Sequence, residues 1–142
     1  MDEECDEVRF DGPVVVVTGG GRGLGREYAV LLAARGAQVL VNDVGTATDG
    51  HGASLAPARA VVEEIRAAGG QAMADGHDVA GAAGARALVA AALERWGRLD
   101  ALVNNAGISI LRPLGELTDE ECRRVMPGTS PAAKPSSRPG TR

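Results

Sequence analysis

The chain has 142 residues, a formal net charge of −4 and 44% hydrophobic residues, which predicts one globular domain. The negative net charge gives no indication of a nucleic-acid partner. No apolar run approaches the ~20 residues that a membrane-spanning helix needs. The two cysteines, Cys5 and Cys122, fit neither a disulfide framework nor a metal-binding spacing. We therefore expect a cytoplasmic protein without a metal, nucleic-acid or membrane partner.

Short apolar runs alternate along the chain with helical patterns. We expect strands at 14–17, 39–41, 71–74 and 99–103, and helices at 24–36, 55–68, 82–96 and 118–125. This alternation predicts right-handed βαβ units and a parallel sheet. The expected fold is therefore a three-layer α/β fold of the Rossmann type, with strand order 3-2-1-4 and helices on both faces of the sheet.

Two helices carry more specific signals. Leu24, Tyr28, Leu31 and Leu32 share one face of the first helix, and we expect that face to pack against the sheet. The segment 118–121 reads T-D-E-E, a capping box that predicts where the last helix begins.

Three regions differ in composition. We expect an acidic leader at 1–11, a dinucleotide-binding domain at 12–126 and a disordered tail at 127–142. The tail contains four prolines and no acidic residue, so it can neither extend a helix nor bury a core. Its composition also suggests a frameshift near Met126, a hypothesis that the gene sequence would test.

A glycine-rich segment, 18–25, lies between the first strand and the first helix and reads T-G-G-G-R-G-L-G. In this position Gly19 permits a tight turn, Gly23 lets the backbone approach a pyrophosphate, and Gly25 lets the helix pack closely on the strand. The free N–H groups and the positive end of the helix would then face the phosphates. The segment therefore predicts a dinucleotide site.

An acidic residue completes this pattern. Asp43 ends the second strand, 18 residues beyond Gly25, where a carboxylate accepts hydrogen bonds from the adenosine ribose hydroxyls. The same carboxylate would repel the additional phosphate of NADP, so we expect NAD as the cofactor and NADP less so. NADP remains the alternative because Arg22 lies in the glycine-rich segment and could pair with that additional phosphate.

Two signatures together resemble a known family. The segment 18–25 resembles the T-G-x-x-x-G-x-G signature of short-chain dehydrogenases/reductases, and 104–107 matches their N-N-A-G signature after the fourth strand. The resemblance covers roughly residues 12–125. The pattern around 43–70 is similar to the (3R)-hydroxyacyl-CoA dehydrogenase domain of peroxisomal multifunctional enzymes and to bacterial relatives.

The resemblance implies roles for further residues. Asp78 and Val79 would receive the adenine ring, and the turn at 104–107 would steady the sheet and line the nicotinamide-ribose side. It also implies an NAD-dependent oxidoreductase that transfers hydride at an alcohol, ketone or 3-hydroxyacyl carbon, and a homo-oligomer in full-length members. The expected cofactor-binding residues are Thr18, Gly19, Arg22, Gly23, Leu24, Gly25, Asp43, Asp78, Val79, Asn104, Ala106 and Gly107.

The family's catalytic motif, Tyr-x-x-x-Lys preceded by a Ser, is not found. The chain has one tyrosine, Tyr28, and one lysine, Lys134, and Leu32 stands four residues after the tyrosine. We therefore expect no catalytic residue in a truncated chain that is inactive and prone to association. The alternative is a non-catalytic half-domain that binds a dinucleotide or docks on a partner.

Overall fold

The computed structural model describes residues 8–46 and 53–125. These residues form two compact units, one within 8–106 and a second over 107–125. The predicted tail, and residues 1–7 of the predicted leader, lie outside the described residues.

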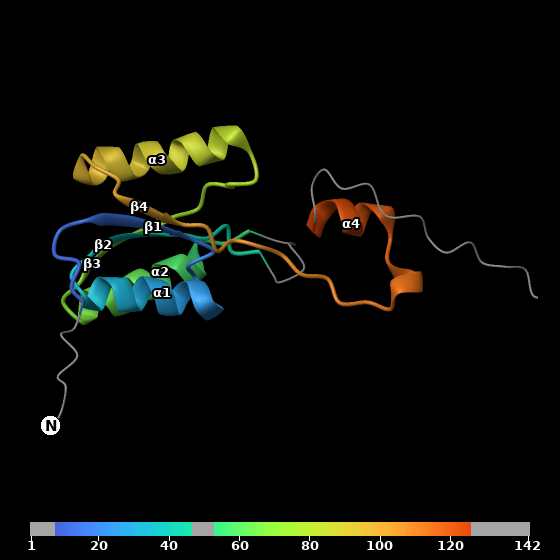
Figure 1. Ribbon diagram of the computed structural model, residues 1–142, viewed down its shortest axis with the longest axis horizontal. Helices are drawn as coiled ribbons and strands as arrows, with labels where there is room; N and C mark the ends of the chain where they lie inside the picture. Colours follow the sequence, from blue (N-terminus) through green and yellow to red (C-terminus); the bar gives the residue numbers. More distant parts are fainter. Residues whose placement is uncertain (1–7, 47–52, 126–142) are drawn as a thin grey trace, which may run out of the picture. The chain divides into compact units, whose positions relative to one another are not determined.

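The first unit is built on a parallel four-stranded sheet with the order β3-β2-β1-β4 (Figure 1). Its elements are β1 (Val14–Thr18), α1 (Gly23–Ala34), β2 (Gln38–Asn42), α2 (Ala56–Ala67), β3 (Gln71–Asp75), α3 (Ala82–Trp96) and β4 (Ala101–Val103). The predicted strand order, the parallel pairing and the helices between the strands are confirmed. β4 is shorter than expected because it begins at Ala101 rather than at Leu99.

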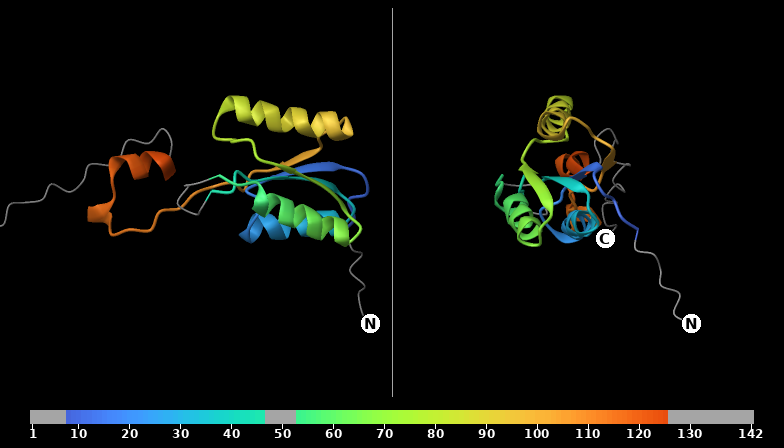
Figure 2. Two further views of the ribbon diagram at one scale, coloured as in Figure 1. Left: turned by 180° about the vertical axis from the view of Figure 1, so that it is seen from behind. Right: turned by 90° about the vertical axis from the view of Figure 1, so that its left-hand side faces the viewer.

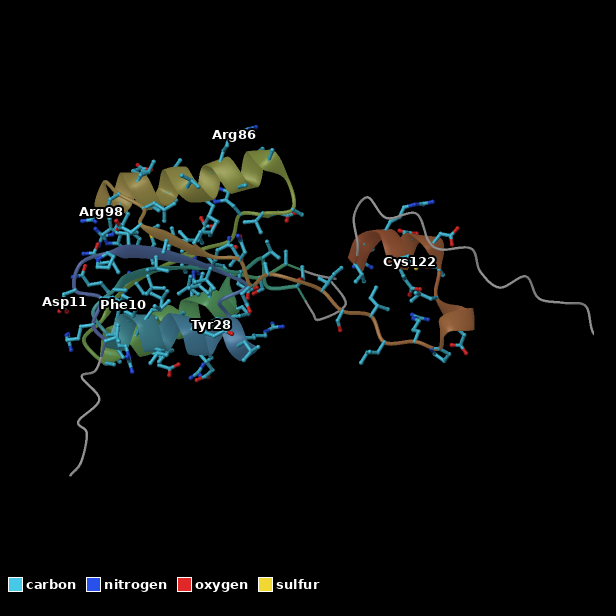
Figure 3. The ribbon with its side chains drawn as sticks, in the orientation of Figure 1. Phe10, Asp11, Tyr28, Arg86, Arg98 and Cys122 are labelled. Carbon is cyan, nitrogen blue, oxygen red and sulfur yellow. The ribbon has the colours of Figure 1, made fainter. Side chains whose placement is uncertain are left out.

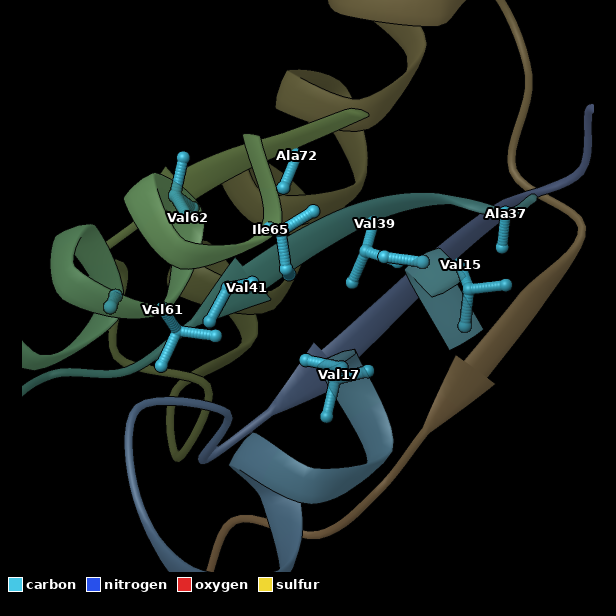
Figure 4. Close-up of a cluster of buried hydrophobic side chains, with 12 residues drawn as sticks. Val15, Val17, Ala37, Val39, Val41, Val61, Val62, Ile65 and Ala72 are labelled. Carbon is cyan, nitrogen blue, oxygen red and sulfur yellow. The ribbon is translucent and has the colours of Figure 1, made fainter. Parts of the chain in front are cut away.

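Helices cover both faces of this sheet (Figure 2). On one face, Val15, Val17, Val39 and Val41 pack with α1 and α2 in a cluster of buried side chains (Figure 4). On the other face, Val14, Val16 and Leu40 pack against Leu88 and Ala92 of α3. Strands buried on both sides explain the continuous β-branched run in β1, because neither face can accept a polar side chain.

The predicted buried face of α1 is wrong in part. The residues of α1 that are buried are Gly25, Ala29 and Ala33, which recur every four positions. Leu24, Tyr28 and Leu31 are instead 67%, 41% and 52% exposed, and Leu32 alone of the predicted face is partly buried against the core. Small residues bring the helix axis close to the sheet, and the large side chains then lie on the outer flank of α1, where Figure 3 labels Tyr28.

β4 forms an open edge of the sheet. Among the described residues it pairs only with β1, and Ala101 and Leu102 are exposed. Leu102 is aligned with Val16, so it points to the face that α3 covers, with 47% of its surface exposed.

The second unit contains η1 (Leu114–Glu116) and α4 (Asp119–Val125). Its capping box is confirmed, because Thr118 Oγ1 accepts from the N–H of Glu121 at 3.2 Å and Glu121 Oε2 accepts from the N–H of Thr118 at 2.9 Å. The bond from the backbone of Thr118 is the main reason why the pKa of Glu121 is lowered. Arg112 adds an ion pair to Glu121 at 3.0 Å.

Candidate functional site

The carboxyl ends of the four parallel strands meet at one edge of the sheet, where ligands of open α/β sheets bind. The glycine-rich segment follows β1, Asp43 follows β2, Asp78 lies just beyond β3, and Asn104 follows β4. The fold therefore gathers the predicted residues of the first unit along one edge. Gly107, also predicted, belongs to the second unit.

The turn between β1 and α1 is shaped by close backbone contacts. A Cβ on Gly25 would collide with the carbonyl oxygen of Gly19, and a Cβ on Gly19 would lie 2.9 Å from Cα of Ala106. Gly23 differs, since it has a φ of +53° and nothing within 4 Å of a Cβ position. Gly19 and Gly25 thus allow the chain to pack on itself, while Gly23 faces open space.

The first turn of α1 is suited to bind an anion. Arg22 is its N-cap residue and its side chain makes no capping hydrogen bond, and the first turn contains no acidic residue. The first N–H groups of a helix have no intrahelical partner and carry the positive end of the dipole. The guanidinium of Arg22 donates instead to the carbonyl of Thr46 at 3.2 Å, so it lies next to the segment that follows Asp43.

The carboxylate of Asp43 is held in place by two backbone donors. Its Oδ2 accepts from the N–H of Gly21 at 2.9 Å, and its Oδ1 accepts from the N–H of Gly45 at 2.7 Å. A carboxylate oxygen has two lone pairs, so each oxygen keeps one acceptor position. Gly21, for which the sequence predicted no role, therefore connects the glycine-rich segment to Asp43.

A second connection joins the glycine loop to the end of β4. Thr18 Oγ1 donates to the carbonyl of Val103 at 3.2 Å and accepts from the N–H groups of Asn105 and Ala106 at 3.1 and 3.0 Å. The side-chain amide of Asn105 donates to the carbonyls of Thr18 and Gly19 at 3.1 and 3.2 Å. Asn105 was missing from the predicted residues, although the N-N-A-G signature contains it.

A buried polar network lies at the ends of β2 and β3. Asn42 donates from Nδ2 to Asp75 Oδ1 at 2.7 Å and to the carbonyl of His77 at 2.9 Å. Asp75 also accepts from the backbone N–H of His77 at 2.9 Å and pairs with its Nδ1 at 2.7 Å. No motif in the sequence predicted this network.

The remaining predicted residues are less constrained. Asp78 is exposed and accepts from the N–H of Ala80 at 2.9 Å. Val79 packs against the buried side chains on the face of the sheet that α3 covers. Leu24 and Asn104 are exposed. The described residues contain no cluster of acidic, histidine and cysteine side chains that could hold a metal ion. None of their helices is long and apolar enough to cross a membrane.

A cavity of about 550 Å³ lies at the other end of the sheet, near the C-terminal ends of α1 and α2. Its lining includes Arg9, Gln38, Glu64 and Gln71, and none of the glycine-loop or acidic residues described above. The chemistry-bearing residues therefore lie along an open edge rather than in this cavity.

The similarity of the chain to known proteins agrees with the resemblance carried by its two signatures. The sequence profile described as short chain dehydrogenase matches residues 13–128. The chain is 48% identical over 125 residues to peroxisomal multifunctional enzyme type 2 of Drosophila melanogaster, a match covering 88% of this chain and 20% of that protein.

Two solved structures are also similar. A short chain dehydrogenase from Mycobacterium avium has a TM-score of 0.71 and 49% identity, and the match covers 81% of this chain and 41% of that one. A 7α-hydroxysteroid dehydrogenase complexed with NADH and 7-oxoglycochenodeoxycholic acid has a TM-score of 0.71 and 35% identity, with 82% and 42% covered. The chain thus spans less than half the length of each of these relatives.

Proposed function

Since the chain belongs to the short-chain dehydrogenase family, we propose that it binds a nicotinamide dinucleotide along the carboxyl ends of its strands, and NAD in preference to NADP. The observation that carries this proposal is the fixed carboxylate of Asp43 beside the glycine loop. A structural neighbour at 35% identity holds NADH, which supports the class of cofactor.

The pyrophosphate would lie against the first turn of α1. Gly23 leaves space there, and the N–H groups of the turn would donate to the phosphate oxygens. Asp78 and Val79 would contact the adenine, and the residues after β4 would line the nicotinamide ribose. These roles are carried over from the family onto the matching positions.

The preference for NAD follows from the geometry of Asp43. Its two remaining acceptor positions suit the two ribose hydroxyls, which are donors. The 2′-phosphate of NADP would bring negative charge to this carboxylate, and the bonds from Gly21 and Gly45 hinder the carboxylate from moving aside. Arg22 is the residue that would favour NADP, since it lies next to the same segment.

Calorimetric titration of the chain with each dinucleotide tests the proposal. We expect NAD to bind more tightly than NADP at the same ionic strength. Equal or tighter binding of NADP would contradict the preference and transfer the determining role to Arg22. Undetectable binding of both would contradict dinucleotide binding altogether.

The reaction is part of the same proposal. Bound NAD would accept hydride from an alcohol carbon, and a 3-hydroxyacyl thioester is a substrate class compatible with the similarity to multifunctional enzyme type 2. The 142-residue chain contains no Tyr-x-x-x-Lys, so no positioned acid or base of the family type would move the hydroxyl proton. We therefore expect this chain to bind NAD without catalysing hydride transfer.

An absorbance assay for NADH with secondary alcohols and 3-hydroxyacyl-CoA thioesters measures this. Saturable turnover would contradict the expected inactivity. Its loss in Tyr28→Phe would then identify Tyr28 as the acid or base, and its persistence would point to another residue.

The alternative function is a non-catalytic module that docks on a partner, and the exposed edge of β4 favours it. Homo-oligomerisation and a cytoplasmic location are further proposals. The name of the fly relative instead favours a peroxisomal location, which fluorescence microscopy of the tagged chain would resolve.

A further inference from the structure

The side chain of Asp75 contacts three groups, one on Asn42 and two on His77. It accepts from the amide of Asn42 at 2.7 Å and from the backbone of His77 at 2.9 Å, and its second oxygen pairs with the imidazole of His77 at 2.7 Å. Asp75 is 6% exposed and Asn42 is 1% exposed, so water has little access to the bond between them, whereas the side chain of His77 is 51% exposed.

The network is closed on the side of Asn42. Both protons of its amide are used, one on Asp75 and one on the carbonyl of His77. The end of β2 is thereby tied twice to the turn that leaves β3. A buried polar network whose members are all satisfied is rigid, and leaving one member without its partner is costly.

The same network lies directly behind the two acidic residues of the site. Asn42 precedes Asp43, and the N–H of Asp43 donates to the backbone carbonyl of Asp75 at 2.9 Å. His77 precedes Asp78. The contacts on Asp75 therefore hold the backbone at Asp43 and at His77, the residue before Asp78.

We propose that Asp75 is a positioning residue for the adenosine half of the dinucleotide: through Asn42 and His77 it fixes Asp43 and Asp78 at the spacing that this half requires. The role rests on the proposed function, because it presupposes that a dinucleotide binds at this edge. Gly20, whose N–H donates to the carbonyl of Asn42, and Gly21, whose N–H donates to Asp43, connect the glycine-rich segment to this network. Thr18 and Asn105 join the same segment to β4.

The imidazole provides a spectroscopic signature of this role. When neutral, it donates from Nδ1 to the carboxylate of Asp75 and keeps its lone pair on Nε2. In Asp75→Asn, the amide oxygen accepts the bonds of Asn42 and the backbone, and the amide nitrogen faces Nδ1 as a donor. The ring then changes to the tautomer with the proton on Nε2, which nitrogen NMR detects.

The experiment compares the wild-type chain with Asp75→Asn and Asp100→Asn. Asp100 is the matched control because its carboxylate also accepts a backbone N–H, that of Val14 at 2.7 Å, but at the amino end of the sheet. Each variant is titrated with ADP-ribose, which carries the adenosine half, and with inorganic pyrophosphate, which engages the phosphate loop alone. His51→Gln in all three leaves one histidine signal, since the chain has two histidines.

We expect Asp75→Asn to weaken ADP-ribose binding about tenfold, the effect of roughly one net hydrogen bond. Pyrophosphate binding should weaken less than ADP-ribose binding, and the tautomer of His77 should switch. Asp100→Asn should alter none of these readouts. Wild-type affinity for ADP-ribose in Asp75→Asn would overturn the role, and equal weakening of both ligands would reduce it to a structural one.

If Asp75→Asn does not fold, the wild-type chain still provides a test. The ring signals of His77 should shift on addition of ADP-ribose and stay in place on addition of pyrophosphate; an unchanged ring on saturation with ADP-ribose would overturn the role. Failure of the wild-type chain to bind ADP-ribose at all would instead contradict the dinucleotide function.

Discussion

At the scale of single residues, Asp43 accepts a hydrogen bond from Gly21 of the glycine-rich segment and is the residue proposed to bind the adenosine ribose. Asp43→Ala should weaken the binding of NAD and reduce the difference in affinity between NAD and NADP. A hydrogen bond to a charged group contributes roughly 1.5–3 kcal/mol, so the loss should be about ten- to a hundredfold. Calorimetry measures it, with Asp11→Ala at the amino end of the sheet as the control. Undiminished NAD affinity in Asp43→Ala would remove Asp43 from the site.

Asp100 makes stability depend on pH. Its hydrogen bond with Arg98, assisted by the N–H of Val14, lowers the pKa of its carboxyl group below the ordinary value. The charged form therefore stabilises the fold at pH values above about 3.9. This contribution should be lost as the pH falls through the lowered pKa of the folded state.

Urea denaturation at a series of acidic pH values measures this contribution. In Asp100→Asn the free energy of unfolding should be lower at neutral pH and should fall less steeply on acidification than in the wild type. Parallel pH curves for the two proteins would show that Asp100 contributes no pH dependence.

The local pattern of the sequence predicted the glycine turn and Asp43, because their roles follow from spacing within one βαβ unit. It did not indicate Asn42 or Asp75, and it marked Asn105 only as part of the N-N-A-G signature. Asn42 and Asp75 are 33 residues apart in the chain, and the side chain of Asn105 donates to carbonyls 86 and 87 residues away. A polar residue at the end of a strand gives no sign of which distant group it will meet.

At the scale of elements, the strand order and the positions of the helices could be predicted, but the buried face of α1 could not. Hydrophobic periodicity weights large apolar side chains, which here are Leu24, Tyr28 and Leu31. The close approach of α1 to the sheet instead selects Gly25 and Ala29, whose small size carries little hydrophobic signal. Distance between layers, rather than hydrophobicity, decides which face is buried.

A pair of substitutions tests this orientation of α1. Leu31→Gln should change the free energy of unfolding by less than about 0.5 kcal/mol, as exposed sites do. Ala29→Leu, at a position that is fully buried, should destabilise by roughly 1–3 kcal/mol through overpacking. Chemical denaturation measures both changes. The opposite ranking would restore the face predicted from the sequence.

At the scale of the whole molecule, the open edge of β4 predicts association. An edge strand that is paired on one side only and carries an exposed leucine can pair with another chain. Among the described residues β4 pairs only with β1, and Leu102 is 47% exposed. Leu102→Lys should shift the elution of the chain towards the monomer in size-exclusion chromatography at several concentrations. Leu31→Lys, on the outer flank of α1, is the control and should leave the elution unchanged. A wild-type chain that is monomeric at every concentration would contradict the prediction.

The link between Thr18 and Asn105 also imposes an order of assembly. The glycine loop is made early during synthesis, but its partners at the end of β4 come up to 88 residues later. Until the ribosome releases that segment, the hydroxyl of Thr18 and the carbonyl of Gly19 have only water as a partner. The nascent chain can therefore form its first strand and helix before the glycine-rich segment becomes rigid, which requires the fourth strand to join the sheet.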